Sequence, residues 1–147
     1  MRVIRKSHVD HKHGKKTHGQ MLSENAKELR SYLNEFVDIT DESLILVREK
    51  GFFKFPAETQ VLCKVVGVTD LYAWAFGHRE FAEIAPSAVK KLVTGKASAS
   101  KEEVAAALES YVGKQEYACD DESDAVAVGI AWLISGGFIE TKSIEAE

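Results

Sequence analysis

The chain has 147 residues, of which 45% are hydrophobic and 29% charged, and its formal net charge is −4. This composition is typical of one soluble globular domain spanning residues 1–147, and two prolines with ten glycines argue against a low-complexity or repeat protein. No apolar run is long enough to cross a membrane, and no apolar segment follows the basic N-terminus, so we expect a cytoplasmic protein. Cys63 and Cys119 lack metal-ligand spacing and are predicted to be reduced thiols.

Charge is distributed unevenly along the chain. A basic N-terminal arm, residues 1–19, opens with a predicted short strand over Met1–Val9 and contains one acid, Asp10. Its histidines fit no zinc-site spacing, so the rest of the arm is predicted to be a solvated basic loop. The lysines of that loop predict contact with a polyanion and are Lys12, Lys15 and Lys16. The chain ends in residues 138–147, predicted to be a frayed acidic tail.

The first half of the chain predicts two helices around a strand. Apolar residues recur at helical spacing from Gln20 to Val37, which predicts an amphipathic helix. The continuous aliphatic run of Ser43–Glu49 predicts a buried strand that ends in charge. Residues Ala57–Phe76 are helical in period but apolar nearly all round, so this second helix is expected to be mostly buried.

The loop after the first buried strand contains three phenylalanines beside two lysines. Lys50, Phe52 and Lys54 belong to it, and it follows the carboxyl end of a strand, where binding sites gather in sheet-and-helix folds. The aromatic rings either tuck under the next helix or stack on nucleic-acid bases. Both interpretations are compatible with the sequence.

The second half predicts one more strand and further helices. Alternation over Glu80–Ala85 predicts a strand, and Ser87–Thr94 a short helix. Ser100 and Glu103 form a capping box, which opens a helix that runs through Tyr111. Because strands alternate with helices, the predicted fold class is α/β with a largely parallel or mixed sheet flanked by helices.

An acidic cluster at 119–124 leads directly into an apolar helix over residues 125–134. Asp121 and Asp124 are three residues apart and therefore project from one face of the helix. Two neighbouring carboxylates need a counter-charge, which a divalent cation supplies. In the alternative interpretation, Asp120 or Asp121 caps the helix and the other acids are solvated.

Four features follow one another in a recognisable order. A strand ends in Glu49, and it is followed by the segments PSAVKKLVTGK at 86–96, ASKEEV at 99–104 and DESDAVA at 121–127. This order resembles the RuvC-type Holliday junction resolvases, particularly the phage and prophage members, within the RNase H-like superfamily. The resemblance covers nearly the whole chain, and its second half is the more specific.

The resemblance implies a Mg²⁺-dependent, structure-specific endonuclease that resolves branched DNA as a homodimer. The family holds two Mg²⁺ with four carboxylates, and Glu49, Asp121 and Asp124 correspond to three of them. Lys90 and Lys101 match family lysines near the scissile phosphate. Further DNA contacts are expected from Phe52, Lys50, Lys54, Lys91, Lys96, Lys12, Lys15 and Lys16.

One family feature has no counterpart in this sequence. The family opens with a strand of the type ILGIDPG that supplies the first catalytic aspartate, whereas Met1–Val9 aligns best with the third strand. Asp10 lies outside any matching motif. The alternative prediction is therefore a catalytically incomplete module of the same fold that binds branched DNA or a recombination partner without cutting.

Overall fold

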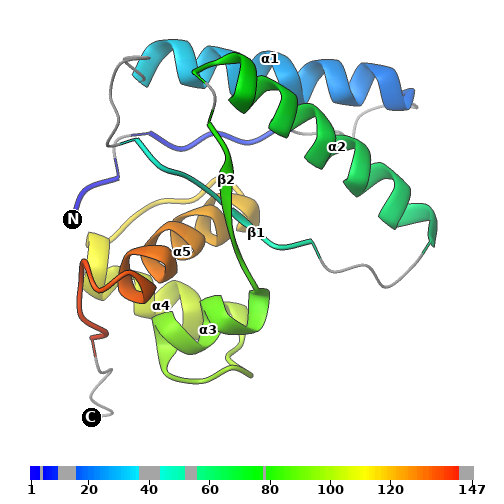
Figure 1. Cartoon of the computed structure of the whole chain (residues 1–147). Coiled ribbons are helices and arrows are strands. Elements are labelled where there is room, and N and C mark those ends of the chain that lie inside the picture. Colours follow the sequence, from blue (N-terminus) through cyan, green and yellow to red (C-terminus); the bar gives the residue numbers. More distant parts are fainter. Residues whose placement is uncertain (4, 10–15, 37–43, 52–55, 78, 143–147) are drawn as a thin grey trace. The chain divides into compact units, whose positions relative to one another are not determined.

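The computed structural model describes residues 1–3, 5–9, 16–36, 44–51, 56–77 and 79–142. In chain order, its elements are α1 (His18–Phe36), β1 (Leu46–Glu49), α2 (Pro56–Ala75), β2 (Phe81–Ile84), α3 (Pro86–Thr94), α4 (Lys101–Val112) and α5 (Asp120–Ser135) (Figure 1). They confirm the predicted mixture of helices and strands. No helix within these ranges combines the length and apolar character needed to cross a membrane.

The chain divides into two compact units, and the boundary falls inside both strands. The first unit contains Met1–His8, Val47–Lys50 and Glu83–Glu147, and the second contains Val9–Leu46 and Gly51–Ala82. A single domain over residues 1–147 stays a prediction. Each unit is described by itself below.

In the second unit, α1 packs against α2. A reciprocal pair of hydrogen bonds fixes the start of α1, since the Gln20 N–H donates to Thr17 Oγ1 and the Thr17 N–H to Gln20 Oε1. The expectation that the second helix is mostly buried is wrong. Ala73 is fully buried, but Leu71 is 65% and Trp74 53% exposed. Apolar residues occur on all sides of α2, whereas only one side of the helix packs against α1.

The two strands are parallel neighbours. The Lys50 N–H donates to the Ile84 carbonyl at 2.8 Å, and the Arg48 guanidinium donates to Glu83 Oε1 at 2.7 Å, so both strands advance in the same direction. Both predicted strands are therefore present but shorter than expected. The predicted strand over Met1–Val9 is wrong for the described residues 1–3 and 5–9, which form no strand. In the described part of the chain the sheet consists of β1 and β2, so the N-terminal segment has no strand with which it pairs.

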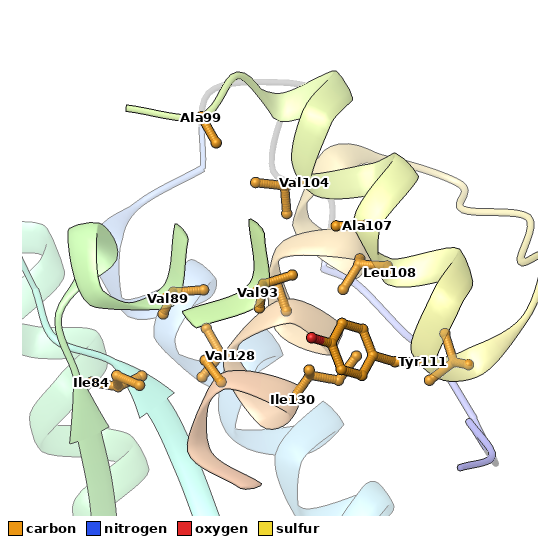
Figure 2. Packing of buried hydrophobic residues seen from close by; sticks show 13 residues of the cluster. Ile84, Val89, Val93, Ala99, Val104, Ala107, Leu108, Tyr111, Val128 and Ile130 are labelled. Carbon is orange, nitrogen blue, oxygen red and sulfur yellow. The ribbon is translucent and has the colours of Figure 1, made fainter. Parts of the chain in front are cut away.

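A hydrophobic core holds α3, α4 and α5 together in the first unit (Figure 2). Val93, Leu108 and Ile130 each come from one of these helices, and each is at most 2% exposed. The predicted capping box at the start of α4 is confirmed: the Glu103 N–H donates to Ser100 Oγ and the Ser100 N–H to Glu103 Oε2. Packing thus holds the three helices together, and the capping box fixes where α4 begins.

The predicted frayed tail is wrong over residues 138–142. The Phe138 ring stacks on Trp132 with centroids 5.3 Å apart, and Ile139 packs against the core. The Lys142 N–H donates to the Tyr111 hydroxyl at 2.8 Å. Two apolar side chains and a backbone hydrogen bond therefore dock this segment despite its charge; residues 143–147 lie outside the described part.

Candidate active site

A pocket within the first unit gathers charged side chains from four elements. Its polar lining consists of Glu49, Lys90, Lys101 and Asp124, and its apolar lining of Pro86, Val89, Val104, Ala127 and Val128. Because two carboxylates and two ammonium groups share this space, we call it the acid–lysine pocket. Residues remote in the sequence meet there.

Local structure explains how each charged side chain reaches the pocket. Glu49 is the last residue of β1, at the edge where the two parallel strands end. Lys90 lies in α3, whose first residue is the proline that follows β2. Lys101 is the first residue of α4, directly after the Ser100 cap. Asp124 follows the first turn of α5.

The two carboxylates are electrostatically strained. Burial raises the pKa of Glu49, and the charge of Asp124 raises it further, while Lys90 lowers it. The pKa of Asp124 is also raised by burial, against the lowering effect of Lys101. Partial desolvation and mutual repulsion therefore penalise the doubly ionised pocket, and a bound cation would relieve this penalty.

Asp120 and Asp121 occupy the exposed first turn of α5 rather than the pocket. Asp120 accepts a hydrogen bond from Lys101 Nζ at 2.9 Å, which raises the pKa of Lys101. Asp121 raises the pKa of Asp124 through its charge. The interpretation that either aspartate caps the helix is wrong, because the N-cap is Cys119, whose extended backbone carries no side-chain capping bond.

The residue types that line the pocket suit a divalent cation, since carboxylate oxygens are ligands that such ions prefer. Within the described ranges, no three His, Cys, Asp or Glu side chains approach closely enough to form a metal cluster. Glu49 and Asp124 nevertheless line one pocket and repel each other. Mg²⁺ is commonly bound by one or two carboxylates together with waters and substrate phosphates, so this donor set suits it.

Comparison with known proteins identifies the family of this chain. The family model for crossover junction endodeoxyribonuclease RuvC matches residues 9–132. The chain belongs to the RuvC family. A crossover junction endodeoxyribonuclease RuvC from Ehrlichia ruminantium (strain Gardel) is 31% identical over 122 residues, which cover 82% of this chain and 72% of that protein.

RuvC structures also share the fold. Thermus thermophilus RuvC in complex with a Holliday junction substrate superposes with a TM-score of 0.71 at 19% identity, covering 84% of this chain and 72% of that one. A second Thermus thermophilus RuvC structure gives 0.66 at 20% identity, covering 83% and 72%. These matches confirm the RNase H-like fold expected from the motif order.

Among the described residues, the pocket lining does not include the other lysines predicted to contact DNA. Lys50, Lys91 and Lys96 are exposed, and Lys96 pairs with Glu103 at 3.4 Å. Lys16 donates to Glu24 Oε2 at 2.9 Å in the second unit. Phe52, Lys54, Lys12, Lys15 and Asp10 lie outside the described residues. The DNA contacts predicted for all of these lysines and for Phe52 remain predictions.

One residue of the α5 first turn, Glu122, is not among the predicted site residues. Glu122 is 7% exposed and is the buried charged residue of the described part of the chain. It accepts hydrogen bonds from the Ala118 N–H at 2.9 Å and from His8 Nδ1 at 3.1 Å. A glutamate three residues after an N-cap is a known capping signal, whereas nothing local in the sequence predicts its pairing with His8.

Proposed function

We propose that this protein hydrolyses phosphodiester bonds in four-way DNA junctions as a Mg²⁺-dependent endonuclease. Membership of a family of crossover junction endodeoxyribonucleases supports the reaction class and the branched substrate. The observation that carries the proposal is the convergence of Glu49 and Asp124 with two lysines in one pocket. Two copies of the chain, one on each of two opposed strands, would make the paired cuts that resolve a junction.

The residues that line the pocket have separate roles in this proposal. Glu49 and Asp124 would hold the cation, and Lys90 and Lys101 would bind the scissile phosphate beside it. When bound, Mg²⁺ supplies an activated water and charge stabilisation for the leaving 3′-oxygen. Val89, Val104 and Val128 form the apolar part of the pocket wall beside these charges.

One observation favours a second candidate, a binding module that holds junctions without cutting them. The acid–lysine pocket contains two carboxylates, whereas the two-metal arrangement implied by the RuvC resemblance uses four. A site with fewer anionic ligands binds metal more weakly. The two candidates share the fold and the DNA substrate, so a cleavage assay distinguishes them.

The proposed function is tested on a synthetic four-way junction and a linear duplex of the same arm sequence. We expect Mg²⁺-dependent cleavage of the junction and negligible cleavage of the duplex. Tight junction binding without cleavage, over a wide range of Mg²⁺ and Mn²⁺ concentrations, would replace the nuclease by the binding module. Equal binding of junction and duplex would contradict both candidates.

Lys90 provides a test of how the pocket holds DNA. Removing one phosphate contact by Lys90→Ala should lower the slope of log Kd against log salt concentration by about 1, measured on the junction without metal. Lys114→Ala is the matched control, since Lys114 is an exposed lysine of the same unit outside the pocket. If both variants change the slope equally, Lys90 makes no specific phosphate contact.

A further inference from the structure

A partly buried hydrogen-bond network in the first unit contributes no group to the acid–lysine pocket. It is centred on Glu122, whose carboxylate accepts from the Ala118 N–H through Oε2 and from His8 through Oε1. Neither His8 nor Glu122 lines the pocket. The network therefore joins the N-terminal segment to the start of α5, both within the first unit.

Helix geometry places this network behind the pocket-facing side of α5. At about 100° per residue, Glu122 projects about 160° away from Asp124 around the helix axis. Asp124 lines the pocket, whereas Glu122 is buried on the opposite side. Glu122 consequently cannot touch a cation or phosphate in the pocket, and it can affect them only through the position of the helix.

The same N-terminal segment makes a second attachment just before α5. Lys6 Nζ donates to the Glu116 carbonyl and lies 4.5 Å from the centroid of the Tyr117 ring. The connector that precedes α5 is thus fixed by Lys6 at one point and by the His8–Glu122 pair at another. The attachments at Glu116 and Glu122, on either side of the start of α5, restrict both the rotation and the axial position of its first turn.

These attachments matter because the first turn of α5 has no side-chain cap. Cys119 occupies the N-cap position without a capping bond, and the exposed Lys101–Asp120 pair contributes little in water. The buried Glu122 side chain anchors this turn instead, because its carboxylate accepts from the Ala118 N–H and from His8. The position of Asp124 therefore depends on Glu122 more than on the exposed acids.

We propose that His8 and Glu122 are positioning residues that hold the first turn of α5 so that Asp124 meets Glu49 at a common cation. This inference rests on the proposed function for the identity of the cation site. It assigns a role in metal binding to the N-terminal segment, which the motif order left without one. Residues that orient a metal ligand commonly change metal affinity by about 10–100-fold when removed.

The test measures Mn²⁺ affinity of the whole chain without DNA, by electron paramagnetic resonance of free Mn²⁺. We expect Glu122→Ala and His8→Ala each to weaken Mn²⁺ binding by about 10-fold. Glu122→Gln should restore near-normal affinity, because its amide oxygen can still accept from the Ala118 N–H and its amide can still bond to His8. Glu140→Gln, at an exposed site of the same unit outside the pocket, should leave the affinity unchanged.

Junction cleavage provides a second readout under single-turnover conditions. In Glu122→Ala we expect a higher Mn²⁺ concentration for half-maximal rate, with metal-free junction binding within about twofold of wild type. Unchanged Mn²⁺ affinity in both alanine variants, with melting curves confirming that they are folded at the assay temperature, would overturn the positioning role. If wild type binds Mn²⁺ but cuts no junction, the proposed function fails, while the affinities still decide this inference.

Discussion

Asp124→Asn and Glu49→Gln are each expected to lower the single-turnover rate of four-way junction cleavage by about 10²–10³-fold, because a metal contributes several kcal/mol of charge stabilisation. Each substitution removes one of the two carboxylates that line the acid–lysine pocket. The measurement is cleavage of a labelled junction at saturating enzyme over a range of Mg²⁺ concentrations. Metal-free junction binding should be retained or tighter, since a negative charge near phosphate is removed.

Asp121→Asn should lower the rate less than either of these substitutions. Asp121 is exposed and outside the pocket, and it acts on Asp124 through its charge. Glu140→Gln removes an exposed carboxylate of the same unit and is the control for net charge. Cleavage that survives in Asp124→Asn at the wild-type rate would show that the pocket is not the catalytic centre.

Much of the helical framework could be predicted from the sequence because its signals are local. Ser100 and Glu103 predict the start of α4, and a group of acids followed by apolar residues predicts α5. Proline and glycine mark the two ends of α3, where Gly95 has a positive φ of 81°. These signals depend on neighbours a few residues away, so they hold whatever the rest of the chain does.

Properties that depend on distant partners could not be predicted in the same way. The apolar character of α2 indicated burial, but exposure is decided by which side meets another helix. The spacing of Asp121 and Asp124 predicts that they share one helix face, but which of them lines a pocket depends on how α5 packs, and Asp124 lines it whereas Asp121 does not. The pairing of His8 with Glu122 joins residues from opposite ends of the chain.

Metal binding should also reverse the stability ranking of the wild type and the Asp124→Asn variant. In the folded protein, the pKa of Asp124 is raised above 3.8 and that of Glu49 above 4.5. The folded state therefore binds more protons than the unfolded state between these ordinary values and the raised ones, and its stability falls as pH rises through that window. Asp124→Asn removes one of these two destabilised negative charges, so it should raise the melting temperature in EDTA at pH 7.

Adding Mn²⁺ should have the opposite effect on the ranking. A cation that binds only the folded state, at a concentration 100 times its Kd, adds about 2.7 kcal/mol to the free energy of unfolding. This raises the wild-type melting temperature by about 5–10 °C. Asp124→Asn should gain much less, because it lacks one of the two carboxylates that would hold the ion. Circular dichroism melts in EDTA and in Mn²⁺ give both quantities, with Glu140→Gln as the control that follows wild type. The idea fails if Asp124→Asn melts below wild type in EDTA and its melting temperature rises as much in Mn²⁺ as that of wild type. The two carboxylates would then neither destabilise the metal-free protein nor hold a cation.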